Sequence, residues 1–176
     1  MYKPFSSNYD SWVGIFSKPK VTEVIPESQL LEVINKFSGW LPSKFSKEIN
    51  GKKYNSTNLG TLVDLLVRAS AQSGDELLLQ FTAKSCASFQ DTEEDSIESL
   101  AQLHFDLTTS SMGLRKTYAK DSAVLEGITV IGLASYSVFE KHPKYKKVLE
   151  YMSSNAQKLA GTKSSPFPGR SVTYKA

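Results

Sequence analysis

Cysteine and histidine are scarce in this chain of 176 residues, which holds one cysteine, Cys86, and two histidines, His104 and His142. A single thiol excludes an intrachain disulfide, and it excludes a cysteine cluster around a metal ion. Zinc sites are usually built from four cysteine or histidine ligands, and two isolated histidines do not supply them. We therefore expect no metal site and no cofactor, with Cys86 acting as a small buried hydrophobic residue.

The sequence also lacks the short motifs of several large enzyme classes. It contains no GxSxG nucleophile elbow, no GxxxxGK[ST] phosphate-binding loop and no GxGxxG dinucleotide-binding turn. His104 and Asp106 lie two residues apart, so on a helix they would not face each other as a catalytic pair. His104 falls instead on an apolar stripe, which indicates a core histidine. An enzyme is therefore disfavoured, although dispersed site residues that include His104 remain an alternative.

No secretory signal or long membrane-spanning run is visible. The first residues, MYKPFSSNYDSW, contain no apolar core of the kind that a signal peptide needs. The most apolar stretch of the chain is interrupted by Thr129, Ser135 and Ser137, and it falls short of the ~18 apolar residues expected of a membrane span. We expect an intracellular, cytoplasmic protein without a transmembrane segment.

The stretch from Asp121 to His142 is the one around which the rest of the chain is organised. It is apolar on almost every side, which is typical of a buried helix rather than a surface helix. Asp121 is a good N-cap residue, and Pro143 ends a helix at or before His142. A strand over residues 128–131 is the alternative, because that run is rich in β-branched residues.

Four further stretches have helical periodicity: residues 26–38, 59–71, 92–118 and 143–159. Thr57 or Asn58 is expected to cap the second of these, and Thr92 begins a capping box for the third. A kink is expected in that third helix near Thr108–Ser111, where helix propensity is poor. Residues 75–89 fit a strand or a helix, and we favour a helix because the surrounding sequence is helical.

Asn50-Gly51 favours a type I′ turn, which predicts one short, exposed β-hairpin near residues 44–57. The expected fold class is therefore mostly α: a single-domain bundle of five or six helices around a buried central helix, with one hairpin. The predicted organisation is an N-terminal extended arm over 1–24, a helical core over 25–161 and a basic C-terminal arm over 162–176.

Both predicted arms carry large apolar side chains, although they show no regular periodicity. Disordered segments are poor in aromatic residues, so we expect these arms to dock on their own core or on a neighbouring subunit. The candidate partner-binding residues of the arms are Tyr2, Phe5, Tyr9, Trp12, Phe16, Phe167 and Tyr174.

Charge is unevenly distributed along the chain, although the net charge is only +3. Residues 141–176 hold eight lysines and arginines against one acid, and the hairpin adds four lysines. Basic side chains interleaved with aromatic ones suit a phosphate backbone, although a solvated surface is the alternative interpretation. The candidate nucleic-acid-binding residues are Lys44, Lys47, Lys52, Lys53, Lys144, Lys146, Lys147, Lys163 and Arg170.

Acidic residues gather instead at 91–98, where Glu93, Glu94 and Asp95 are candidate contacts for a basic protein partner. The leading hypothesis is a non-enzymatic assembly subunit whose arms bind neighbouring subunits, with nucleic acid as an additional partner in a coat or nucleocapsid-like role. The alternative is a monomer that neutralises or escorts one protein partner, as immunity proteins and chaperones do.

Overall fold

The structure is a computed structural model, and it describes residues 25–90 and 95–161. These residues form seven α-helices and one two-stranded antiparallel hairpin, which confirms the mostly α fold class. The two segments predicted as arms, 1–24 and 162–176, lie outside the described residues. The order of elements is α2 (Glu27–Ser38), β1 (Ser46–Ile49), β2 (Lys52–Asn55), α3 (Ser56–Ser73), α4 (Glu76–Ala87), α5 (Ile97–Thr117), α6 (Ser122–Phe139), α7 (Tyr145–Ser154) and α8 (Ala156–Ala160).

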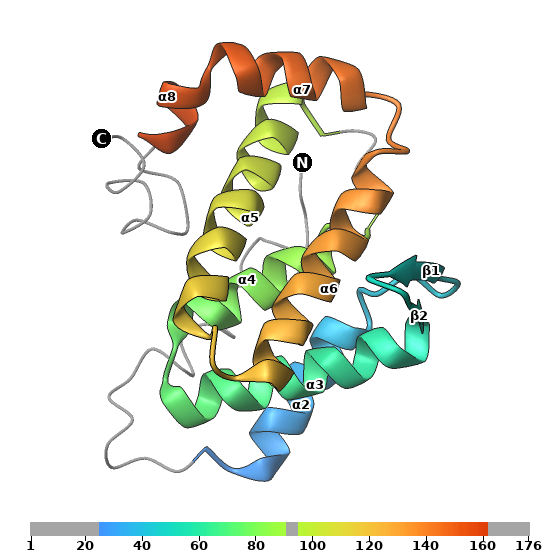
Figure 1. The fold of residues 1–176 in the computed structure, drawn as a ribbon, viewed down its shortest axis with the longest axis vertical. Coiled ribbons are helices and arrows are strands. Elements are labelled where there is room, and N and C mark those ends of the chain that lie inside the picture. The colour runs from blue at the N-terminus through green and yellow to red at the C-terminus, as the bar shows by residue number, and fades with distance from the viewer. Residues whose placement is uncertain (1–24, 91–94, 162–176) are drawn as a thin grey trace.

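Helices α5 and α6 lie side by side along the long axis of the molecule (Figure 1). Helix α7 lies across one end of α5, while α3 and α4 pack against α6 towards the other end and α2 packs on α3 and α4. The larger apolar cluster joins α2, α3, α4, α5, α6 and the hairpin. A smaller cluster lies under α7 and α8 and contains Leu100, Ala101, Phe139, Val148 and Leu159. The long pair of helices therefore links the two parts of the core.

The most completely buried helix is α4, in which every residue from Leu78 to Ala87 is buried. It contacts α2, α3, α5 and α6. Residues 75–89 had no clear amphipathic pattern because a helix covered on all sides needs no polar face. The helix expected over 121–142, α6, is buried along much of its length, although it leaves Leu133 and Tyr136 exposed.

Glycine at position 127 allows α6 to lie close to α3. A Cβ atom at Gly127 would be 2.9 Å from Cδ2 of Leu66, which is fully buried. At Gly132 a Cβ atom would meet its nearest neighbour, the Ser111 hydroxyl, at 3.6 Å. The close approach of α6 to α3 therefore depends on Gly127 and not on Gly132.

Side-chain caps fix where α5 and α6 begin. Asp121 accepts a hydrogen bond of 3.2 Å from the Val124 N–H group, which confirms it as the N-cap of α6. The predicted start of the preceding helix at Thr92 is wrong. Ser96 is the N-cap of α5, and its hydroxyl accepts a hydrogen bond of 3.0 Å from the Ser99 N–H group. Helix α5 thus begins at a serine cap next to its first apolar residue, and Thr92 of the expected capping box lies outside the described residues.

Helix α5 also runs without a break through Thr108–Ser111, where a kink was expected. The Thr108 hydroxyl donates to the His104 carbonyl at 2.8 Å, and the Ser110 hydroxyl donates to the Asp106 carbonyl at 2.7 Å. These hydroxyls bond one turn back within the helix instead of competing with it. Burial of Asp106, Leu107 and Ser110 outweighs the poor propensity of this segment.

The hairpin has the predicted turn, with Asn50 and Gly51 at φ values of 53° and 81°. Its second strand leads directly into α3, which begins earlier than predicted. Asn55 and Asn58 form a reciprocal capping box there, with each side chain accepting a hydrogen bond from the other residue's N–H group. The expected cap, Thr57 or Asn58, is therefore replaced by Asn55, with Asn58 as its partner.

One face of the hairpin is docked on the fold, which corrects the expectation that the hairpin is exposed. Ile49 and Tyr54 are buried, and the Tyr54 hydroxyl donates to Glu126 at 2.6 Å. This bond raises the pKa of Tyr54 to about 12 and lowers that of Glu126. The strands thus hold Tyr54 against α6, and the opposite face of the hairpin remains exposed.

The single helix predicted over 143–159 is wrong, because α7 and α8 are separate helices. Asn155 leaves helical geometry at φ −126° and ψ 28°, and its side-chain amide donates to the Tyr151 carbonyl at 2.9 Å. The Asn155 N–H group also donates to the Tyr151 carbonyl, at 2.9 Å, so α7 ends at this residue. Helix α8 then turns back against α5.

Helix α6 is long and apolar enough to span a membrane, with a mean hydropathy of 1.5 over 18 residues. Half of that window is buried inside the fold, and the core helix of a water-soluble domain has the same length and composition. The predicted absence of a membrane span therefore stays a prediction.

Candidate functional site

A groove of about 290 Å³ lies between α5 and α6. The residues that line it are mostly three or four positions apart along each helix, because side chains with this spacing share one face of a helix. Helix α5 contributes His104, Leu107, Thr108, Ser111 and Arg115, and α6 contributes Thr129, Gly132, Leu133, Ser135 and Tyr136. Gly132 carries no side chain, so the α6 wall is open at that position.

Exposed apolar side chains are concentrated on the two helices that form the groove. Leu133 and Tyr136 are 44% and 38% exposed and line the groove, and Met112 of α5 is 48% exposed. The Tyr136 ring is held in place by a hydrogen bond of 2.9 Å between its hydroxyl and that of Tyr145. Single exposed apolar residues are ordinary, but a group beside a concave surface is typical of a binding site.

His104 belongs to the most buried part of the groove wall, and its ring stacks on that of Phe139 with centroids 3.8 Å apart. Burial, together with the neighbouring charges of His142 and Lys84, lowers the pKa of His104 to about 3. The imidazole is therefore neutral near pH 7 and is a poor proton acceptor there. Its position agrees with the interpretation of His104 as a core histidine.

Arg115 supplies the one charged group that lines the groove. Its Nε donates to the Ser111 carbonyl at a long distance of 3.4 Å, and the side chain is otherwise exposed. None of the ten lining residues is acidic. Deeper in the wall, the hydroxyls of Ser135 and Ser88 share a hydrogen bond of 2.6 Å. The groove thus combines apolar surface with hydroxyl groups, and among the described residues that line it Arg115 is the only one with a permanent charge.

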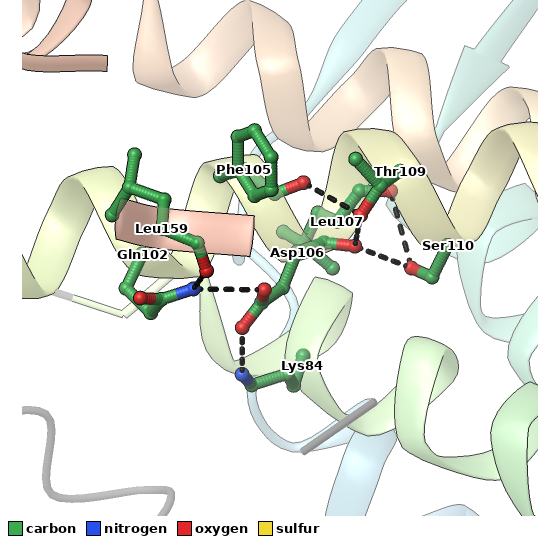
Figure 2. Close-up of polar contacts among 8 residues, drawn as sticks. All are labelled: Lys84, Gln102, Phe105, Asp106, Leu107, Thr109, Ser110 and Leu159. Atoms are coloured by element: carbon green, nitrogen blue, oxygen red, sulfur yellow. Dashed lines mark hydrogen bonds and ion pairs between the residues drawn. The ribbon is translucent and has the colours of Figure 1, made fainter. Parts of the chain in front are cut away.

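A second polar cluster lies inside the fold, around the ion pair of Lys84 and Asp106 (Figure 2). The Gln102 amide donates to the Asp106 carboxylate at 3.0 Å and to the Leu159 carbonyl at 3.2 Å. Burial lowers the pKa of Lys84 to about 8, although Asp106 acts in the opposite direction. The cluster joins α4, α5 and α8, and neither Lys84 nor Asp106 lines the groove.

Sequence reasoning did not find this cluster, because its charged members lie 22 residues apart. The available signal was one lysine and one aspartate, each within an otherwise buried helical stretch. Charged residues are almost never fully buried unless they are paired. Each of these two residues therefore implied a partner, but the sequence did not identify it.

The candidate nucleic-acid-binding residues fall on two separate parts of the fold. Lys44, Lys47 and Lys53 are exposed on or beside the hairpin, and Lys146 and Lys147 are exposed on α7 (Figure 1). Two others take part in structural contacts: Lys52 Nζ lies 3.4 Å from Glu126, and Lys144 Nζ donates to the Asp95 carbonyl at 2.6 Å. Lys163 and Arg170 lie outside the described residues.

The candidate protein-binding residues are only partly described. Asp95 is 1% exposed, so its expected place on an exposed acidic surface is corrected. The reason is that Asp95 lies where the chain enters α5, next to the start of α7, and its carbonyl receives the bond from Lys144. Glu93 and Glu94 lie outside the described residues, as do Tyr2, Phe5, Tyr9, Trp12, Phe16, Phe167 and Tyr174.

Metal-binding clusters of three or more histidine, cysteine or acidic residues are absent from residues 25–90 and 95–161. Cys86 is fully buried, and burial raises the pKa of its thiol. A reactive cysteine needs an accessible thiolate, so Cys86 is inert in this fold.

Comparison with known proteins gives no further assignment for the groove. No protein-family model matches the chain, and no curated protein or solved structure is detectably similar to it.

Proposed function

We propose that this chain is a non-enzymatic assembly subunit, and that the groove between α5 and α6 receives part of a neighbouring subunit. The observation that supports this most directly is that two exposed apolar side chains, Leu133 and Tyr136, line the groove. Apolar side chains of this size are stabilised when a partner removes them from water, by about 25 cal/mol per Å² of buried apolar surface. A groove that combines such side chains with hydroxyl groups suits a protein segment.

The chemistry of the same groove supports binding over catalysis. Its imidazole, His104, is neutral and stacked on Phe139, and no carboxylate lines the groove. General acid–base catalysis requires a group that titrates near the working pH within reach of the substrate. Arg115 carries a fixed charge and does not meet this requirement.

Two leucines of similar exposure allow a matched test of the proposal. Leu133 is 44% exposed in the groove, and Leu31 is 42% exposed on α2. We expect Leu133→Glu to reduce the mass of the species measured by light scattering, because it puts a charge into the contact. Leu31→Glu should leave that mass unchanged. Equal effects of the two variants, with both chains folded by circular dichroism, would contradict the proposal.

Nucleic acid is a second proposed partner, supported by the exposed lysines of the hairpin and of α7. Each lysine that neutralises a phosphate releases a counterion, so binding should weaken steeply as salt is raised. A purified species with excess absorbance at 260 nm that is lost at high salt would support this role. If the chain assembles without this excess absorbance at 260 nm, its proposed function is restricted to protein contacts.

The alternative is a monomer that neutralises or escorts one protein partner, and it predicts no self-association in the light-scattering measurement. It requires a stable species of 19.5 kDa, whose Leu133→Glu variant loses a different protein partner.

A further inference from the structure

The groove between α5 and α6 carries features that select one segment of this chain as its occupant. We propose that residues 9–12 of a second copy bind there, with Tyr9 and Trp12 on the apolar wall and Asp10 beside Arg115. This inference rests on the proposed assembly function, and it adds the identity of the segment and the contacts that hold it.

The shape and lining of the groove suit aromatic side chains. Its volume of about 290 Å³ is just below the range for ligand pockets, roughly 300–1,000 Å³. It therefore fits individual side chains better than a large cofactor. Tyrosine and tryptophan combine an apolar ring with one polar tip, and they bind best where apolar wall and hydrogen-bonding groups lie together. Leu107 and Leu133 supply the wall, and Thr108, Ser111 and Thr129 supply hydroxyl groups.

Charge distinguishes between the two terminal segments. The groove contains Arg115 and no acidic residue, and Lys116 and Lys120 follow Arg115 on exposed positions. Asp10 is the only acidic residue among residues 1–22, and it lies between Tyr9 and Trp12. Residues 162–176 contain no aspartate or glutamate and three basic residues. Arg115 therefore attracts the N-terminal segment at Asp10 and repels the basic side chains of the C-terminal one.

The length of the N-terminal segment allows a contact with a second copy. Twelve residues separate Trp12 from Ile25, where the described structure begins, and such a stretch spans up to roughly 40 Å when extended. Ile25 leads into α2, which packs on α3 and α4 rather than on the helices of the groove. The segment is thus long enough to leave its own fold and reach the groove of a neighbour.

Disulfide trapping in the full chain tests this contact, because the one native thiol, Cys86, is fully buried. The pair is Ser11→Cys, next to Trp12, and Thr129→Cys on the groove wall. Equal amounts of the two single variants are mixed and oxidised with copper phenanthroline. The matched control replaces Thr129→Cys with Thr61→Cys, which is exposed on α3. Two cysteines join only when their Cα atoms come within ~7 Å, so a non-contacting pair forms little product.

The inference expects a covalent dimer in the Ser11→Cys and Thr129→Cys mixture, with the peptides of positions 11 and 129 joined in the mass spectrum. The Thr61→Cys mixture should lack the corresponding product. A chain that self-associates by light scattering but gives no such link would overturn this inference and leave the proposed function standing. A chain that does not self-associate would overturn both. A double variant that closes within one chain, while the mixture gives no dimer, would show that the segment occupies its own groove.

Discussion

The ammonium nitrogen of Lys84 lies 3.4 Å from Oδ2 of Asp106 in the interior of the fold, with side chains only 10% and 4% exposed. The pair connects α4 to α5, and Gln102 extends it to the carbonyl of Leu159 in α8. Moving two charges out of water costs free energy, and the attraction between them offsets this cost. Removal of one member leaves the other charge buried without that attraction, so the pair stabilises the fold only while both members are present.

Replacement of Asp106 by asparagine should therefore destabilise the fold strongly. Asp106→Asn keeps the shape of the side chain but removes the negative charge that lies 3.4 Å from the buried Lys84 ammonium group, and breaking such a pair costs about 3–5 kcal/mol. The double variant Lys84→Met/Asp106→Leu should recover much of that loss, since no buried charge remains. Urea denaturation of the three chains measures this. A loss below about 1 kcal/mol for Asp106→Asn, the range of a solvated surface pair, would contradict the account.

Acid should destabilise the fold through His104. Its pKa is lowered from 6.5 to about 3 in the folded chain, so between these values the unfolded chain binds a proton that the folded chain does not. The stability contributed by neutral His104 is present above pH 6.5 and is lost as the pH falls towards 3, at about 1.4 kcal/mol per pH unit. The carboxyl groups of aspartate and glutamate titrate in the same pH range. The effect of His104 is therefore measured as the difference in stability between the native chain and a variant without this histidine.

His104→Leu removes the titrating group, and its stability should therefore fall less steeply from pH 6.5 to pH 3 than that of the native chain. Thermal denaturation at a series of pH values gives both slopes. Parallel curves for the two chains would mean that His104 is accessible to protons and is not buried as described.

Gly127 and Gly132 provide a matched pair of glycines on α6. Alanine is favoured over glycine in a helix by about 1 kcal/mol, so Gly132→Ala should be neutral or stabilising. Gly127→Ala places a methyl group 2.9 Å from the buried Leu66, and such overpacking costs about 1–3 kcal/mol. We expect a lower melting temperature for Gly127→Ala than for Gly132→Ala. The reverse order would show that α6 does not approach α3 as closely as the structure has it.

Reversal of the charge at Arg115 should weaken self-association, and reversal at Asp10 should restore it. An exposed ion pair contributes about 0.2–1 kcal/mol, so Arg115→Asp should raise the dissociation constant up to about fivefold. Asp10→Arg combined with Arg115→Asp should return it towards the native value. Sedimentation equilibrium at low salt measures both, with Lys158→Asp, exposed on α8, as the control. If the double variant does not recover the native dissociation constant, Asp10 and Arg115 do not contact each other.

Local signals in the sequence predicted local structure well. Asn50-Gly51 gave the hairpin turn and Asp121 gave the N-cap of α6, because each depends on the conformation of a few neighbouring residues. Where two local signals competed, the sequence did not decide between them. Thr92 and Ser96 both suit an N-cap, and Asn155 breaks a stretch whose apolar periodicity continues through it.

Packing between distant segments was not predictable in the same way. An apolar α6 was expected to be buried on all sides, but the number of neighbours available to a helix is set by the whole fold, and Leu133 remained exposed. The groove forms because of the way α5 and α6 lie relative to each other. The residue type at a single position such as Thr108 or Thr129 does not indicate that arrangement. His104 was recognised as a core residue from its periodicity, whereas its stacking on Phe139 was not.

Light scattering of the untagged full chain over a range of concentrations tests the central claim most directly. An assembly subunit should give a mass above 19.5 kDa that rises with concentration, and the Leu133→Glu chain should stay near the monomer mass under the same conditions. A constant mass of 19.5 kDa at every concentration, from a folded native chain, would contradict the assembly function.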